Sequence, residues 1–125
     1  MELKFWQCPK CGKIVAVVQP SKCNMLACCN QPMVEVTANT TDAAVEKHVP
    51  EYTVNGNIVD VVVGSVEHPM MEEHYIKWIL VQTNQGNQRK ELTPGSAPKA
   101  SFALLPGEKV EAVYAYCNLH GLWKK

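Results

Sequence analysis

The sequence lacks an excess of charge of either sign, because its 12 basic side chains equal its 12 acidic side chains. We therefore expect no basic surface of the kind that binds nucleic acid. It also lacks an apolar run of membrane-spanning length, since even the apolar segment 58–63 is interrupted by Asp60. The first residues lack the basic and then apolar pattern of a signal peptide. We expect a cytoplasmic protein that has neither nucleic acid nor membrane as a partner.

Histidine is absent from residues 1–47, and cysteine is absent from residues 30–116. The C-terminal two-thirds of the chain therefore holds a small set of imidazoles and one thiol: His48, His68, His74, His120 and Cys117. Nitrogen-rich ligation with one thiolate favours a redox-active transition metal over a structural zinc ion. The set predicts a metal centre that can bind and reduce a small oxidant.

The other cysteines lie near the N-terminus, in the pattern Cys8-x-x-Cys11 followed by the adjacent pair Cys28-Cys29. A disulfide framework would require an oxidising compartment, and a bond between adjacent cysteines would be strained. Metal ligation by four thiolates explains the pattern better. A fifth cysteine, Cys23, either replaces one of the adjacent pair or is a spare free thiol, and we favour the spare thiol.

Two modules are expected. Residues 1–36 are too few to bury a sufficient apolar core alone, so a metal centre would stabilise them. A strand is expected at 14–18, and a bend at 28–29 would bring the adjacent cysteines together. Residues 37–44 are small and polar and are typical of a linker. The second module is 37–125.

The second module has the pattern of an antiparallel β-sandwich. Asn55-Gly56 is a hairpin signal, and further turns follow at intervals typical of such folds. Strands are expected at 52–54, 58–63, 75–83, 89–93, 100–104 and 109–116. One helical turn is expected at 43–47. The predicted ligands then lie at strand ends and in loops, where a rigid sandwich can hold them.

Three classes of function remain open on these grounds. The first is a redox enzyme that acts on a small oxygen species. The second is a blue-copper electron carrier, but such a site usually has an axial methionine, and none follows His120. The third is a zinc-stabilised interaction module, which would leave the four histidines unexplained.

The motifs together resemble those of desulfoferrodoxin, the two-iron form of superoxide reductase, over nearly the whole chain. The N-terminal cysteine pattern resembles desulforedoxin. The family's remaining motifs match Glu46-Lys47-His48-Val49-Pro50, Glu67-His68-Pro69-Met70, Glu73-His74-Tyr75-Ile76 and Cys117-Asn118-Leu119-His120-Gly121.

The resemblance implies a mainly β chain, in which a small desulforedoxin-like iron module with four cysteine ligands precedes an immunoglobulin-like antiparallel β-sandwich. It implies one iron held by Cys8, Cys11, Cys28 and Cys29, and a second held by His48, His68, His74 and His120 in a plane with Cys117 axial. The implied reaction is one-electron reduction of superoxide to hydrogen peroxide without release of dioxygen. A rubredoxin-like donor and a homodimer are implied as well.

Two residues beside His48 are expected to take part in the reaction. Lys47 would add positive charge at the open face of the iron, which attracts an anion. Glu46 is the sixth ligand of the ferric resting state that the resemblance implies. Without the resemblance, Glu46 and Lys47 would be interpreted as a solvated charge pair.

Overall fold

The computed structural model describes residues 3–125, which divide into a first unit that ends at Thr37 and a second unit, Ala38–Lys125. The boundary expected from sequence lies one residue earlier, after residue 36. Nearly all regular structure in both units is antiparallel β-strand, so the predicted mainly β class is confirmed. No helix in the described residues is long and apolar enough to span a membrane.

The first unit consists of five short strands. They are β1 (Phe5–Gln7), β2 (Ile14–Ala16), β3 (Ala27–Cys28), β4 (Gln31–Pro32) and β5 (Val34–Val36). Three of them form a sheet of order β2-β1-β5, and β3 pairs with β4. The buried apolar side chains described in this unit are Phe5, Cys8 and Met33. This is a very small core, in agreement with the expectation that the unit needs another source of stability.

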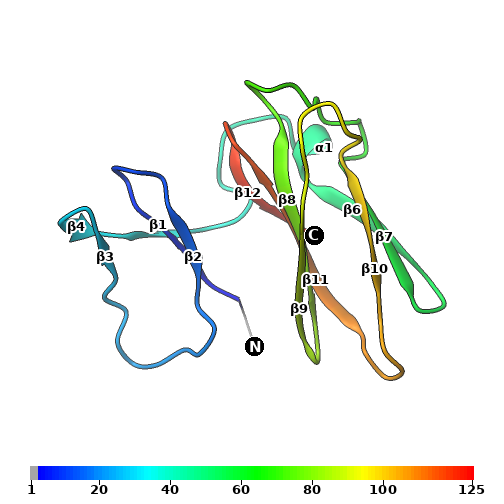
Figure 1. The fold of residues 1–125 in the computed structure, drawn as a ribbon, viewed down its shortest axis with the longest axis horizontal. Coiled ribbons are helices and arrows are strands. Elements are labelled where there is room, and N and C mark those ends of the chain that lie inside the picture. Colours follow the sequence, from blue (N-terminus) through cyan, green and yellow to red (C-terminus); the bar gives the residue numbers. More distant parts are fainter. Residues whose placement is uncertain (1–2) are drawn as a thin grey trace. The chain divides into compact units, whose positions relative to one another are not determined.

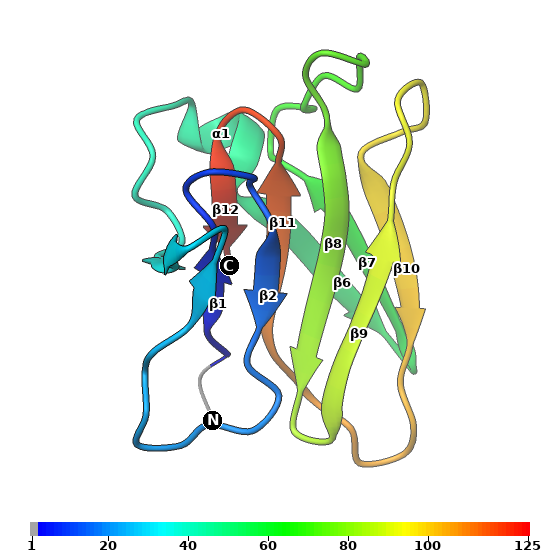
Figure 2. The ribbon, with the colours of Figure 1, turned by 60° about the vertical axis from the view of Figure 1, so that its left-hand side comes forward.

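The second unit is a sandwich of two antiparallel sheets. One has the order β10-β7-β6 and the other β12-β11-β8-β9, and Figures 1 and 2 show the two layers face to face. Sheets of three and four strands are typical of immunoglobulin-like folds. The strands are β6 (Pro50–Asn55), β7 (Ile58–Val63), β8 (Ile76–Thr83), β9 (Gly86–Glu91), β10 (Lys99–Ala103), β11 (Val110–Cys117) and β12 (Gly121–Lys124).

The core lies between these sheets. In β7, Val59, Val61 and Val63 are buried while the residues between them are exposed, which is the alternation expected of a strand with one face inward. They pack with Ile76, Ile79 and Val81 of β8, Phe102 of β10, and Val113, Ala115 and Cys117 of β11. One of the predicted metal-ligating residues, Cys117, is thus also a member of the core.

In the second unit the strand predicted at 58–63 has the observed bounds, the other predicted strands occur with shifted ends, and one strand was missed. In the first unit only the strand at 14–18 was predicted, so β1, β3, β4 and β5 were missed. The hairpin expected at Asn55-Gly56 joins β6 to β7, with Asn55 paired to Ile58. The prediction of 89–93 was shifted, because β9 pairs with β8 from Gly86 onward. Strand β12 was not predicted, since four residues after a ligand motif give no clear alternation.

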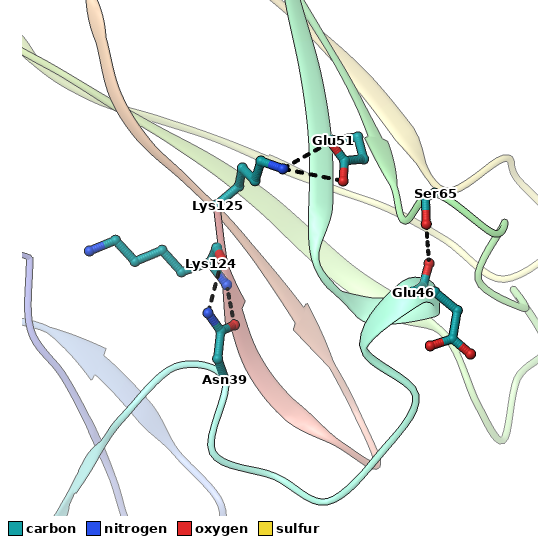
Figure 3. Close-up of polar contacts among 6 residues, drawn as sticks. All are labelled: Asn39, Glu46, Glu51, Ser65, Lys124 and Lys125. Carbon is teal, nitrogen blue, oxygen red and sulfur yellow. Dashed lines mark hydrogen bonds and ion pairs between the residues drawn. The ribbon is translucent and has the colours of Figure 1, made fainter.

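The edges of the sandwich are covered by side chains. Gln88 on β9 donates a hydrogen bond of 2.8 Å to the backbone carbonyl of Ala103 on β10, and Lys90 donates to the carbonyl of Ser101. At β12 the Asn39 side chain bonds to the N–H and the C=O of Lys124, at 2.9 and 3.0 Å (Figure 3). These contacts occupy backbone groups that an edge strand would otherwise expose.

One end of the sandwich carries the short helix α1 (Val45–His48), the loop between β7 and β8, and the turn between β11 and β12 (Figure 2). The carbonyl of Glu46 on α1 accepts a hydrogen bond of 3.2 Å from the hydroxyl of Ser65, which Figure 3 shows. It accepts a second, of 2.9 Å, from the N–H of Val66. A Cβ added at Gly64 would lie 2.6 Å from that same carbonyl oxygen. The close approach of α1 to the loop therefore requires glycine at this position.

We predict that Gly64→Ala lowers the free energy of unfolding of the second unit by about 1–3 kcal/mol, as overpacking does, and displaces α1. The added methyl group meets backbone atoms of Glu46, Lys47 and Val49, which cannot move as a flexible side chain would. Urea unfolding and the amide NMR resonances of residues 45–48 measure the two effects.

The control for this variant is Gly56→Ala. Gly56 has a φ of +61°, and nothing lies within 4 Å of a Cβ added there. The control should lose stability through backbone strain, yet leave the resonances of α1 unchanged. Wild-type α1 resonances in Gly64→Ala would contradict the proposed collision.

Candidate metal centres

Four cysteines of the first unit converge from two turns. Cys8 and Cys11 lie at the turn between β1 and β2, and Cys28 and Cys29 at the turn between β3 and β4. Cys29 and Asn30 have φ angles of 55° and 60°, as both central residues of a type I′ hairpin turn do. This turn is the bend expected at 28–29, and it directs adjacent cysteine side chains to one cluster.

The spacing of these sulfur atoms fits a single metal ion. All four lie within 4.8 Å of one another, with 3.8 Å between Cys11 and Cys28 and 3.9 Å between Cys28 and Cys29. A tetrahedral ion with metal–sulfur bonds of about 2.3 Å holds its ligands about 3.8 Å apart. Cys23 is exposed and lies outside this group.

The pKa values of Cys8 and Cys29 are shifted in opposite directions. The backbone N–H of Cys11 lies 3.4 Å from the Cys8 sulfur and lowers the pKa of Cys8 to about 6. Contacts with the sulfurs of Cys11 and Cys28 raise the pKa of Cys29 to about 12. Crowded thiolates repel one another. A cation at the centre of the group would remove this conflict, so the cluster fits a metal site.

The second cluster forms at the end of the sandwich that carries α1. His48 ends α1, His68 and His74 lie in the loop between β7 and β8, and Cys117 and His120 flank the turn between β11 and β12. The ring nitrogens of His48, His74 and His120 and the Cys117 sulfur all lie within 4.8 Å of one another. His68 lies outside that tight group, but its Nε2 is 3.1 Å from Nε2 of His48.

The four imidazole rings form a square. Neighbouring rings, in the order His48, His68, His74 and His120, have centroids 4.6 to 5.1 Å apart and are nearly perpendicular. His48 and His74 are opposite corners, with centroids 6.3 Å apart and planes 30° apart. Metal–nitrogen bonds of about 2.1 Å place adjacent corners of a square about 3.0 Å apart. The Nδ1 of His120 is 3.1 Å from Nε2 of His48, in agreement with that value.

Backbone carbonyls fix two of the rings. Nδ1 of His48 lies 2.8 Å from the carbonyl of Ala44, and Nδ1 of His68 lies 2.6 Å from that of Pro69. Each Nδ1 then carries the proton, and each Nε2 presents a lone pair to the cluster. Nε2 of His74 is buried and has no hydrogen-bond partner in the described residues. A buried ring nitrogen without a hydrogen-bond partner, on a residue of this donor cluster, fits a role in metal ligation.

Burial favours the neutral form of three of these imidazoles, those of His48, His68 and His74. It lowers the pKa of His48 and that of His74, and it lowers the pKa of His68 to about 4. Neutral imidazole is the form that binds metals. These three histidines are therefore ready to act as ligands at neutral pH.

Cys117 is directed to the cluster by a local irregularity of β11. The pairing of β11 with β8 shifts in register between Tyr116 and Cys117, and such bulges redirect side chains at sites. Burial raises the pKa of the Cys117 thiol, while the backbone N–H groups of Leu119 and His120 act in the opposite direction. Those N–H groups would stabilise a thiolate.

Two residues in contact with the cluster were not singled out as functional from the sequence. The Trp123 ring stacks on His48, with centroids 4.9 Å apart, and its Nε1 donates to the carbonyl of His120 at 3.1 Å. Asn118 hydrogen-bonds to residues beside His74. The position of Asn118 within the motif Cys-Asn-Leu-His was a signal for its role, but no pattern in the sequence pairs Trp123 with His48.

Glu46 and Lys47 lie on α1 directly before His48, and both are exposed. The Glu46 carboxylate makes no hydrogen bond or ion pair within residues 3–125, and Figure 3 shows only its backbone carbonyl bonded to Ser65. After burial and the charge of His120, the charge of Lys47 contributes to the lowered pKa of His74. The cation of Lys47 therefore acts electrostatically on the cluster.

Comparison with known proteins agrees with this geometry. The family model described as desulfoferrodoxin matches residues 40–125. The desulfoferrodoxin of Clostridium acetobutylicum is 46% identical over 98% of this chain and 95% of its own length. The desulfoferrodoxin homolog of Archaeoglobus fulgidus is 48% identical over the same shares.

The solved structures include similar folds. The crystal structure of the superoxide reductase from Treponema pallidum matches with a TM-score of 0.83 at 40% identity, over 100% of this chain and 99% of its own. The one-iron superoxide reductase from Giardia intestinalis matches with a TM-score of 0.55 at 42% identity, over 64% of this chain and 95% of its own. The resemblance inferred from the motifs is thus confirmed: the chain belongs to the desulfoferrodoxin family, and its two donor clusters fit the two iron centres of that family.

Proposed function

We propose that the protein is a superoxide reductase. One superoxide anion takes up one electron and two protons and becomes one molecule of hydrogen peroxide, and no dioxygen is released. The reaction takes place at an iron held by His48, His68, His74, His120 and Cys117. The convergence of four imidazoles and one thiol at one end of the sandwich is the observation that carries this proposal.

The charge of this donor set suits an anionic substrate. Four neutral imidazoles and one thiolate bring a single negative charge, so a divalent ion among them retains a net charge of +1. Such a site attracts superoxide electrostatically. When bound, iron supplies the transferable electron and an open position at which the anion is received. The five protein donors would leave a six-coordinate ion one position for the anion.

Cys117 is the donor that would have the largest effect on the electron density of the iron. A thiolate raises the electron density on iron, as it does in haem–thiolate enzymes. The N–H groups of Leu119 and His120 lie against the Cys117 sulfur and limit that effect. Burial of the sulfur, which is 0% exposed, keeps water from the thiolate.

Lys47 and Glu46 have separate roles in this proposal. Lys47 guides the anion to the site and stabilises negative charge that develops during reduction. Its electrostatic effect on His74 supports the assignment. The Glu46 carboxylate makes no hydrogen bond or ion pair in the described residues, so it would be available as the additional ligand of the ferric iron that the family resemblance implies.

The cysteine cluster of the first unit serves a different purpose. We propose that Cys8, Cys11, Cys28 and Cys29 hold an iron with no open position, which stabilises residues 1–36 and relays electrons. Cys23 is not a ligand. A rubredoxin-like donor and a homodimer complete the proposal, and both rest on the family resemblance. A cytoplasmic location is proposed as well, as expected from the sequence.

The ratio of products tests the proposed reaction. The iron-loaded, reduced protein should yield one hydrogen peroxide per superoxide and no dioxygen. A dismutase would yield one hydrogen peroxide and one dioxygen from every two superoxide anions. Metal analysis and visible spectra belong to the same experiment, because a blue-copper spectrum or zinc alone would contradict the proposal.

We predict that Cys117→Ser abolishes superoxide reduction and removes the thiolate-to-iron absorption band. Serine has nearly the same shape, but its hydroxyl does not ionise at neutral pH. The absorption of the first-unit iron should remain and serves as the internal control. Unchanged activity in the iron-loaded variant would contradict the ligand assignment.

We predict that Cys29→Ser removes the absorption of the first iron and destabilises residues 1–36, because this unit has a very small core. Reduction of superoxide by the chemically reduced second centre should survive. Cys23→Ser is the matched control and should leave the first iron in place. If Cys23→Ser removed the first iron and Cys29→Ser left it in place, the ligands of this iron would have to be reassigned.

We predict that Lys47→Ala slows the bimolecular reaction with superoxide by on the order of tenfold and weakens its dependence on ionic strength. The iron spectrum should hardly change. Glu46→Ala should instead keep the encounter rate and shift the ferric spectrum, because water or another anion takes the sixth position. Pulse radiolysis at two salt concentrations measures both variants. Equal rates and salt slopes for Lys47→Ala and wild type would show that Lys47 is only a solvated surface charge.

A further inference from the structure

His74 differs from the other histidines of the cluster in how its ring is held. The rings of His48 and His68 are fixed by hydrogen bonds from Nδ1 to backbone carbonyls. The backbone of His120 is tied to Trp123 by the indole N–H. No hydrogen bond to either ring nitrogen of His74 occurs within residues 3–125, and Nε2 is buried. The position of the His74 ring therefore depends on its backbone.

That backbone is held on one side by a short local bridge. Met71 and His74 exchange two backbone hydrogen bonds, of 2.9 and 3.0 Å. The bridge closes the loop on itself, but it does not connect His74 to the strands that carry the other donors. The pairing of Ile76 with Cys117 holds the start of β8 beside the end of β11. A further contact is needed to fix the two residues, His74 and Tyr75, that precede this pair.

Asn118 makes that connection. Its Oδ1 accepts the backbone N–H of Tyr75 at 3.0 Å, and its Nδ2 donates to the carbonyl of Glu73 at 3.2 Å. Its own backbone N–H donates to the carbonyl of Tyr75 at 3.2 Å. These three bonds hold the residues on both sides of His74, and Asn118 directly follows Cys117 in the chain. One residue thus joins the loop of His74 to the strand end that carries the thiol.

We propose that Asn118 is a positioning residue that fixes His74 relative to Cys117 and so completes the ligand square. The primary amide of Asn118 provides an acceptor for Tyr75 and a donor for Glu73 on two separate atoms. Aspartate retains the acceptor alone, and leucine retains neither, although both are close to asparagine in size. The proposal concerns metal binding at the site assigned above, so it rests on the proposed function only for the identity of that metal.

The test compares Asn118→Leu and Asn118→Asp with wild type in the full iron-loaded chain. The readouts are iron affinity, by competition with a chelator, and the thiolate-to-iron absorption of the second centre. Loss of a residue that orients a metal ligand costs about 10- to 100-fold in affinity. We expect a loss in that range and a shifted band for Asn118→Leu, and a smaller loss for Asn118→Asp. The absorption of the first iron should not change.

A double-mutant cycle shows whether Asn118 acts through His74. In a His74→Ala background the further effect of Asn118→Leu on affinity should disappear, because the ring that it positions is absent. In a His68→Ala background, where the altered ring has its own bond to Pro69, the effect should persist. Equal effects in both backgrounds would overturn the proposal, and so would wild-type affinity in Asn118→Leu.

Asn118→Asp keeps the test decisive if the leucine variant does not fold. An aspartate variant with wild-type affinity and band would overturn the role of the Nδ2 donor. None of these readouts uses superoxide. A protein that binds iron as described but does not reduce superoxide would therefore refute the proposed function and leave the role of Asn118 intact.

Discussion

The packing of β7 against β8 and β11 is the constraint on which the second metal centre depends. His68 follows β7 and donates its backbone N–H to the carbonyl of Val63, the last residue of that strand, at 3.0 Å. His74 precedes β8 by two residues, and Cys117, at the end of β11, pairs with Ile76 at the start of β8. The valines and isoleucines between the sheets therefore determine where the metal-binding histidines and Cys117 lie, although the valines and isoleucines bind no metal themselves. Precision at the site comes from close packing, because a filled core leaves few alternative positions for the strand ends.

The two units position their metal-binding side chains in opposite ways. In the second unit a large apolar core holds the donors in place, and carbonyls, N–H groups and the Trp123 ring orient them. In the first unit the core consists of very few side chains, and the donors come from tight turns. There the left-handed conformation of Cys29 makes two adjacent thiols converge. A metal ion would stabilise the fold of the first unit, whereas the folded second unit itself positions the donors for its metal ion.

Much of the fold and of the donor set could be predicted from the sequence because both leave local signals. The alternation in 58–63 and the Asn55-Gly56 turn are short-range patterns, and the histidines and cysteines are rare residues in compact motifs. The order of the rings in the square could not be predicted, because it depends on which loops meet. The stacking of Trp123 on His48 was missed for the same reason, since contacts between distant segments leave no periodic trace. Strand β12 was missed because its four residues show no clear alternation, although it pairs with the neighbouring strand β11. The bulge before Cys117 depends on the register of β8 and β11, which no single strand specifies.

The square of imidazoles also has a consequence for the order of folding. His48 and His120 are 72 positions apart in the chain, and Asn118 is 43 positions from Tyr75. Such long-range contacts form late, because the entropy of closing the intervening loops is lost before they contribute. The cysteines of the first unit are at most 21 positions apart, from Cys8 to Cys29. A nascent chain can thus capture metal at its N-terminal cysteines while the second centre does not yet exist. Only a chain that has paired both sheets can hold metal there, so occupancy of the second centre reports that folding is complete.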